Sequence, residues 1–295
     1  MYYNESTILF LDGKFIKAAD ARADLFSQTL HYGYGVFEGI RSYQTINGTK
    51  IFKPGEHFER LRRSCILMGI PMNYNVEELT QLSYQVLERN NLSEAYLRPL
   101  VFCSPNMSLT APKEVSVMIA AWDWGKYFSN TSLRVCISSF QRPNPKSVKV
   151  EAKACGYYVN SILATMEAKE RGFDEALMLD MNGFVAEGPG ANFFFEKDGV
   201  LYTPPLGNIL PGITRHTVID ICRELDIPAV EKYFRPEDLF EADSAFFCGT
   251  AAEITAIESI EGQTFHKPWK KSLGRVMQEA YQSIVLDKSY SYVIV

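Results

Sequence analysis

The segment Val150-Glu-Ala-Lys-Ala-Cys-Gly-Tyr-Tyr-Val-Asn-Ser-Ile-Leu-Ala-Thr-Met166 lies near the middle of the 295-residue chain. In it, Lys153 precedes a turn of small residues, and apolar residues at helical spacing then predict a helix that ends near Gly172. A lysine amine held in an apolar pocket loses its proton more readily and becomes a nucleophile that can form a Schiff base. Most lysines are solvated, and Lys146 and Lys149 lie close by, so spacing alone leaves the assignment open.

The composition is typical of a soluble globular protein, with 46% hydrophobic and 22% charged residues. A net charge of −5 without an evident basic patch argues against nucleic acid as a partner. We expect no membrane partner, because no apolar run is long enough to cross a bilayer, and the first residues do not resemble a signal peptide. The six cysteines show neither zinc-ligand nor redox spacing, so we expect no metal and a cytoplasmic protein with reduced thiols.

Helical and strand patterns mix in both halves of the chain, and several strand pairs flank hairpin turns such as Asp12-Gly13, Asn182-Gly183 and Asp198-Gly199. This mixture predicts an α+β protein rather than a doubly wound parallel sheet. The expected organisation is a small N-terminal domain over residues 1–122, an interdomain loop over 123–131 and a larger C-terminal domain over 132–295 that carries Lys153.

Three features are compatible with a bound phosphate group. Leu210-Pro-Gly-Ile-Thr-Arg215 opens an expected helix, and the free amides of a helix N-terminus attract anions; we expect Thr214 to cap this helix. Gly249-Thr-Ala-Ala-Glu253 follows a strand with small residues that let the backbone approach a ligand. Arg60 lies on an expected helix and offers paired donors to phosphate oxygens. Each feature also has an ordinary explanation, as a helix cap, a tight turn or a solvated basic face.

The segment Glu187-Gly-Pro-Gly-Ala-Asn192 places a carboxylate at the end of a strand, before a glycine-rich turn. A carboxylate held there could pair with a protonated pyridine nitrogen and keep the ring cationic, which makes the ring an electron sink. A polar hairpin turn is the ordinary alternative.

Taken in order, these segments resemble one family of enzymes. The set includes His31-Tyr-Gly-Tyr-Gly-Val-Phe-Glu-Gly-Ile-Arg41, Tyr96-Leu-Arg-Pro-Leu100, Ala152-Lys-Ala-Cys-Gly-Tyr-Tyr158, Glu187–Asn192, Leu210–Arg215 and Gly249–Glu253, and it is similar to the branched-chain amino-acid aminotransferases. These are class IV aminotransferases with the fold type IV architecture of pyridoxal-phosphate enzymes. The resemblance implies two domains, a smaller N-terminal α/β sandwich and a larger C-terminal domain with a barrel-like β core and flanking helices.

The resemblance also implies roles for individual residues. Lys153 matches the lysine that forms the Schiff base with pyridoxal 5'-phosphate and shuttles the substrate Cα proton, and Glu187 matches the partner of the pyridine nitrogen. Tyr158 matches the tyrosine near the cofactor O3'. The matching phosphate cradle consists of Arg60, Ile213, Thr214 and Thr250.

The remaining matches concern the substrate. The implied walls of the apolar pocket are Phe37, Trp124, Tyr127 and Tyr158; the region for the substrate α-carboxylate is Gly39, Tyr96, Ala251 and Ala252; and Tyr32 and the loop around Met107 are expected from a neighbouring subunit. Arg98 matches the arginine that binds the distal carboxylate of glutamate or 2-oxoglutarate, with an internal salt bridge to a glutamate as its alternative. Ala191 departs from the family pattern, which has glutamate there.

The function that the resemblance implies is transfer of an amino group between leucine, isoleucine or valine and 2-oxoglutarate, in a homodimer or higher assembly. The alternatives are a D-amino-acid aminotransferase or an aminodeoxychorismate lyase of the same fold, and a non-catalytic vitamin-B6-binding protein.

Overall fold

The computed structural model describes residues 2–125 and 127–288. The chain forms two compact units, one of residues 1–125 with 152–157 and the other of residues 126–151 with 158–295. The short segment with Lys153 therefore packs with the N-terminal unit, whereas the sequence predicts that it belongs to the C-terminal domain.

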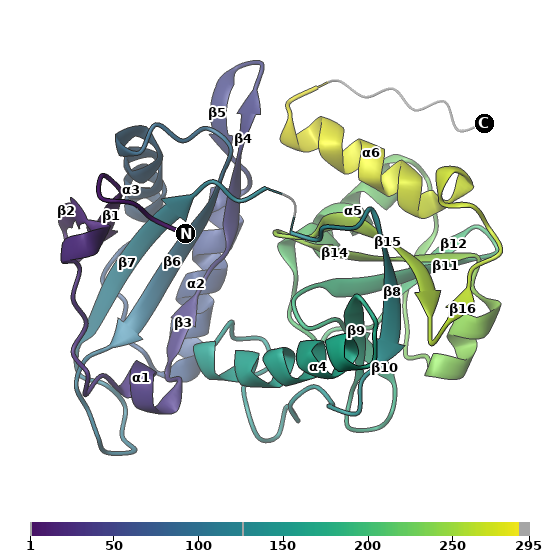
Figure 1. Cartoon of the computed structure of the whole chain (residues 1–295), viewed down its shortest axis with the longest axis horizontal. Helices are drawn as coiled ribbons and strands as arrows, with labels where there is room; N and C mark the ends of the chain where they lie inside the picture. The colour runs from purple at the N-terminus through teal and green to yellow at the C-terminus, as the bar shows by residue number, and fades with distance from the viewer. Residues whose placement is uncertain (1, 126, 289–295) are drawn as a thin grey trace. The chain divides into compact units, whose positions relative to one another are not determined.

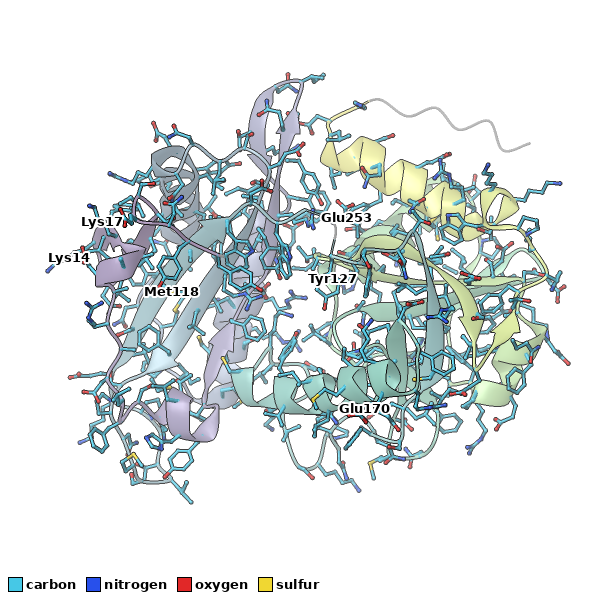
Figure 2. The ribbon with its side chains drawn as sticks, viewed as in Figure 1. Lys14, Lys17, Met118, Tyr127, Glu170 and Glu253 are labelled. Carbon is cyan, nitrogen blue, oxygen red and sulfur yellow. The ribbon has the colours of Figure 1, made fainter. Side chains whose placement is uncertain are left out.

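The first unit contains a seven-stranded sheet in the order β2-β1-β7-β6-β4-β5, with β3 also paired to β6 (Figure 1). Every pairing in this sheet is antiparallel. Its strands are β1 (Ile8–Leu11), β2 (Lys14–Lys17), β3 (Gly35–Phe37), β4 (Ile40–Thr45), β5 (Gly48–Ile51), β6 (Ala95–Cys103) and β7 (Val115–Trp122). Figure 2 shows Lys14 and Lys17 on the predicted hairpin of β1 and β2, where Asp12 takes a positive φ of 45°.

Helices α2 (Pro54–Met68) and α3 (Val76–Arg89) pack on this sheet. Phe58 and Leu61 of α2 and Val86 of α3 are fully buried against apolar residues of the strands. Asn75 begins α3 with a reciprocal capping box to Glu78. The stretch around His31 contains the end of a short helix, α1 (Gln28–Tyr32), followed by two strands.

The second unit contains a nine-stranded sheet in the order β10-β9-β8-β15-β14-β11-β12-β13, with β16 paired to β15. Because β10 pairs with both β9 and β11, six of these strands close into a barrel. The strands are β8 (Ser132–Ile137), β9 (Glu175–Leu179), β10 (Val185–Glu187), β11 (Asn192–Lys197), β12 (Val200–Thr203), β13 (Ala229–Glu231), β14 (Ser244–Gly249), β15 (Glu253–Ile260) and β16 (Gln263–Thr264). The barrel core is rich in phenylalanine, including Phe193, Phe195 and Phe247.

Among the described residues of the second unit, the α-helices are α4 (Tyr158–Glu170), α5 (Ile213–Glu224) and α6 (Leu273–Val285). In Figure 1, α5 and α6 lie on the side of β14 and β15, and they pack against each other. Ser272 caps α6 through its side chain, and Trp269–Lys271 before it forms a separate 3₁₀ turn.

The apolar residues whose spacing predicted α4 do not form its buried face. Its apolar stripe, Val159, Ile162, Leu163 and Met166, is 39–61% exposed, while the buried positions are the small residues Ser161, Ala164 and Ala168. Small residues allow α4 to approach the barrel closely, and they carry little hydrophobic signal in the sequence.

Candidate active site

Lys153 is held by its backbone to two elements of the first unit. Its amide donates to Ser64 Oγ on α2 at 3.1 Å, and its carbonyl accepts from the amide of Phe37 at 3.1 Å. The turn after Lys153 lies close to Gly33, where glycine is needed because an added Cβ would lie 2.6 Å from the Cα of Gly156. The Lys153 Nζ lies 4.9 Å from the centre of the Phe37 ring. The structure thus presents a partly buried amine on an aromatic ring.

Arg98 lies over the same aromatic ring. Its guanidinium carbon is 4.7 Å from the centre of the Phe37 ring, 5.5 Å from that of Tyr96 and 5.9 Å from that of Trp122. Its Nε is buried and finds no hydrogen-bond partner among the described residues. The salt bridge to a glutamate, the alternative weighed for Arg98, is not among the ion pairs of residues 2–125 and 127–288. A buried guanidinium shielded by aromatic rings suits a ligand carboxylate.

Gly39, Tyr96 and Trp124 form one group beside Arg98. A Cβ at Gly39 would lie 1.8 Å from the Tyr96 hydroxyl oxygen, so glycine alone leaves room for that side chain. The Trp124 ring stands edge-on to the Tyr96 ring, with 4.6 Å between their centres. The structure therefore brings together Lys153, Phe37 and Arg98 with three further predicted substrate residues.

Arg60 has a partner that the sequence analysis did not identify. It donates from Nε and Nη2 to Glu38 at 2.7 and 2.9 Å, and His57 Nδ1 lies 2.7 Å from the same carboxylate. Burial by itself would raise the pKa of Glu38, but Arg60 and His57 overcome it and hold that pKa well below its usual range. The spacing of His57 and Arg60, three apart on one helix face, is the signal that could have indicated a buried carboxylate nearby.

Tyr32 and Met107 are joined at the surface of the first unit. The Tyr32 hydroxyl donates to the Met107 carbonyl at 3.1 Å, and the two side chains are 45% and 48% exposed. Leu25, Phe26, Leu30 and Leu109 are also exposed there. The amide of Asn106 donates to the carbonyl of Phe26, which ties the two loops into one apolar surface.

Glu187, in the second unit, is a buried carboxylate with several donors. Asn192 Nδ2 donates to it at 3.0 Å, the amide of Leu210 lies 3.2 Å away, and Arg142 Nε lies 3.0 Å from its Oε1. Arg142 is a functional candidate that the sequence analysis did not name. It lies in a loop rich in proline and asparagine, a composition that gives no sign of a buried ion pair.

The start of α5 lies next to Glu187. Asn192 Nδ2 also donates to the carbonyl of Leu210, and a Cβ at Gly212 would lie 1.8 Å from Asn192 Oδ1. Gly212 is the N-cap and forms no side-chain cap, so the prediction that Thr214 caps this helix is wrong. Thr214 is the second helical residue and is buried. The amides of Ile213 and Thr214 belong to the first turn, whose N–H groups have no acceptor within the helix.

The segment Gly249–Glu253 lies next to the turn between Glu187 and Asn192. Asn192 pairs with Cys248, and a Cβ at Gly249 would lie 3.3 Å from the carbonyl of Gly190. Thr250, Ala251 and Ala252 follow between β14 and β15. Tyr127, labelled in Figure 2, packs on this turn, since a Cβ at Gly190 would lie 3.5 Å from its hydroxyl.

Two further residues singled out in the sequence also lie in the second unit. Ala191 is buried in the barrel core, and Tyr158 is the first residue of α4.

The group around Glu187 in the second unit suits two parts of pyridoxal 5'-phosphate. The second unit combines an uncapped helix start, suitable for a phosphate, with a buried carboxylate, suitable for a ring nitrogen, and Asn192 links them. No group of metal-ligating side chains occurs among the described residues, and no helix there is long and apolar enough to cross a membrane.

Comparison with known proteins identifies the family. Residues 35–260 match the model of the amino-transferase class IV family. The chain therefore belongs to the class IV aminotransferases, and it is an aminotransferase that uses pyridoxal 5'-phosphate.

Individual relatives are similar over almost the full length. The branched-chain-amino-acid aminotransferase of Pseudomonas aeruginosa is 40% identical over 97% of this chain and 95% of its own. The crystal structure of the branched-chain aminotransferase from Thermoproteus uzoniensis with norvaline has a TM-score of 0.92 and 41% identity, covering 96% of both chains. The crystal structure of the branched-chain amino acid aminotransferase from Thermobaculum terrenum in its PLP form has a TM-score of 0.90 and 31% identity, covering 97% of this chain and 95% of its own. These findings confirm the predicted family, fold class, enzymatic nature and cofactor.

Proposed function

We propose that this enzyme transfers an amino group between leucine, isoleucine or valine and 2-oxoglutarate, giving branched-chain 2-oxo acids and L-glutamate. The observation that carries the proposal is that the Lys153 amine and the Arg98 guanidinium both contact the ring of Phe37, at 4.9 and 4.7 Å. The ring offers an apolar surface to a branched side chain, and the cation beside it offers a partner to a second carboxylate. Relatives named as branched-chain aminotransferases support the same substrates.

The proposed roles follow the chemistry of each side chain. Bound cofactor supplies an electron sink that stabilises negative charge at the substrate Cα. Lys153 carries the cofactor covalently and moves the Cα proton, and Glu187 holds the ring nitrogen. Tyr158 lies at the ring hydroxyl, and the amides of Ile213, Thr214 and Thr250 receive the phosphate together with Arg60.

The remaining proposed roles concern the substrate. Gly39, Tyr96, Ala251 and Ala252 receive the α-carboxylate, and Phe37, Trp124, Tyr127 and Tyr158 wall the side-chain pocket. We assign Arg98 to the distal carboxylate of the acceptor.

We further propose that the enzyme is a cytoplasmic homodimer or larger assembly. The six cysteines are unpaired thiols, as expected in a reducing compartment. The side chains around Tyr32 and Met107 are apolar and exposed, and a second copy of the chain would bury them. Sedimentation of the purified protein tests the assembly, and Tyr32→Asp should weaken it.

The test of the function is a substrate panel in single turnovers. The cofactor of the purified enzyme absorbs visible or near-visible light, and L-leucine, L-isoleucine, L-valine and L-glutamate should each convert it to the amino form, whereas D-alanine should not. Reaction with D-alanine alone would indicate a D-amino-acid aminotransferase. Pyruvate release from aminodeoxychorismate would indicate the lyase, and cofactor binding without any conversion would indicate a carrier.

Mapping the cofactor attachment tests Lys153 itself. Borohydride reduction and peptide mapping should place the pyridoxyl group on Lys153, and Lys153→Ala should abolish steady-state turnover with the fold intact. Modification of Lys146 or Lys149 instead would refute the assignment.

A further inference from the structure

Arg142 forms a buried ion pair with the carboxylate proposed to hold the cofactor. Its Nε lies 3.0 Å from Glu187 Oε1, and the two side chains are only 11% and 5% exposed. We propose that Arg142 is a positioning residue that keeps Glu187 ionised. Glu187 and the cofactor ring nitrogen share one proton, and Arg142 keeps that proton on the nitrogen. This inference rests on the proposed role of Glu187.

Arg142 is held by its backbone and by its guanidinium within the second unit. The amide of Arg142 donates to the carbonyl of Leu179 on β9 at 2.8 Å, and its Nη1 donates to Ser161 Oγ on α4 at 3.3 Å. The neighbouring carbonyl of Gln141 accepts from Asn160 Nδ2 at 2.9 Å. Pro143 follows directly and restricts the backbone. These hydrogen bonds fix the position of Arg142 beside Glu187.

Arg142 acts on Glu187 through its charge more than through an aligned hydrogen bond. Its Nε lies within ion-pair distance of Glu187. The Nε is buried, however, and forms no hydrogen bond of good geometry with an acceptor among the described residues. Asn192 and the amide of Leu210, which also donate to this carboxylate, are neutral groups. A Coulomb interaction depends on distance rather than on the N–H direction, so lysine should replace Arg142 better than an uncharged residue of similar length.

The charge decides where the shared proton resides. A ring nitrogen and a carboxylate in contact compete for one proton, and a cation beside the carboxylate makes it the weaker base. With Arg142 present, the proton stays on nitrogen and the ring stays cationic, as an electron sink requires. Without Arg142, the proton moves from nitrogen to a Glu187 oxygen and the ring becomes neutral. The transfer moves one proton within the pair and needs no other reactant.

The test is the nitrogen-15 chemical shift of ring-labelled pyridoxal 5'-phosphate in the holoenzyme, which separates protonated from neutral pyridine. Arg142→Met should move the signal to the neutral side. Arg142→Lys, which keeps the charge, and Ser161→Ala, which removes only the Nη1 partner, should keep it at the parental position. A parental signal in Arg142→Met with full cofactor occupancy would overturn the proposal.

A second measurement needs no Arg142 variant. In the infrared spectrum of the parental apoprotein at neutral pH, the Glu187 band, assigned by its loss in Glu187→Gln, should be that of a carboxylate; a carboxylic acid band overturns the proposal. Failure of the proposed function gives a different result. A neutral ring in the parental holoenzyme would overturn the role of Glu187 and this inference with it, whereas a protonated ring in both the parent and Arg142→Met overturns only the inference.

Discussion

Arg60 and Glu38 form a two-point ion pair, with Nε to Oε1 at 2.7 Å and Nη2 to Oε2 at 2.9 Å, and their side chains are 9% and 0% exposed. The charge of Arg60 is therefore balanced within its own unit. Removing one partner of a buried pair leaves the other charge without compensation, which costs more than the pair itself contributes. Arg60 thus combines a structural role with its proposed contact to the cofactor phosphate.

We predict that Arg60→Ala lowers the unfolding free energy of the apoprotein by about 3–5 kcal/mol, because Glu38 loses its cation. Urea unfolding measures this. Arg62→Ala is the matched control, since Arg62 pairs with Glu59 at the surface and its loss should cost less than about 0.5 kcal/mol.

The double variant Glu38→Met with Arg60→Leu separates stability from binding. It removes both charges, so it should unfold at a higher urea concentration than Arg60→Ala while still binding the cofactor weakly. If the Arg60→Ala apoprotein is as stable as the parental apoprotein, Arg60 does not have this structural role.

The stability of the first unit should fall on the acid side. Burial lowers the pKa of His57, although Glu38 beside it acts in the opposite direction, and the pKa of Glu38 is also held low. Below about pH 6.5 the unfolded chain takes up a proton at His57, and below about pH 4.3 it does so at a glutamate, while the folded protein resists both. Stability is therefore greatest above about pH 6.5 and declines as the pH falls.

His57→Asn should remove the upper part of that decline. The informative quantity is the difference in unfolding free energy between variant and parent, measured from neutral pH down to about pH 5, because other titrating groups cancel in it. A difference that does not change with pH would show that His57 does not contribute through its proton.

The native thiols should react slowly with Ellman's reagent. Burial raises the pKa of Cys65 and Cys222 to about 12 and that of Cys136 and Cys155 to about 11. Few of these thiols are thiolates at pH 8, and only thiolates react. Cys155 is partly exposed and should react first, whereas all six should react rapidly in guanidinium chloride. Rapid labelling of more than one thiol in the native enzyme would be inconsistent with this burial.

The sequence predicted the elements whose pattern is local. The hairpin at Asp12-Gly13 appears as expected, because turn chemistry acts between neighbours. Strand β15 was missed, because Glu253–Ile260 interleaves polar residues with its apolar ones and follows β14 after a short, glycine-led turn.

Residues that act through distant partners were harder to predict. Glu38 lies between Phe37 and Gly39 in a segment that resembles a loop, and its charge is compensated by a helix some twenty positions later. Arg142 lies 45 positions before Glu187, and no local rule links them. The catalytic and substrate residues were predicted through the family resemblance, and their individual roles stay predictions.

Gly39 should be needed for the position of Tyr96. The Cβ of alanine would overlap the Tyr96 hydroxyl at 1.8 Å, and that side chain is packed against Trp124 and cannot withdraw freely. Gly39→Ala should raise the KM for every amino-acid substrate by about tenfold or more, with about 1–3 kcal/mol lost through overpacking. Gly55→Ala is the control, because a Cβ there meets nothing within 4 Å. Equal kinetics for the two variants would mean that Tyr96 can move without consequence.

The last prediction concerns how one pocket accepts an apolar donor and an acceptor with a second carboxylate. A wholly apolar pocket would leave that carboxylate without partners, whereas an exposed cation would penalise leucine. Arg98 meets both requirements, because its guanidinium is covered by the rings of Phe37, Tyr96 and Trp122 and its buried Nε has no acceptor among the described residues. Arg98→Leu should slow the half-reaction with glutamate or 2-oxoglutarate by about 1.5–3 kcal/mol more than the half-reaction with leucine, the value of a charge-assisted hydrogen bond. Single-turnover spectra measure the two half-reactions separately, and equal losses in both would make Arg98 a structural residue.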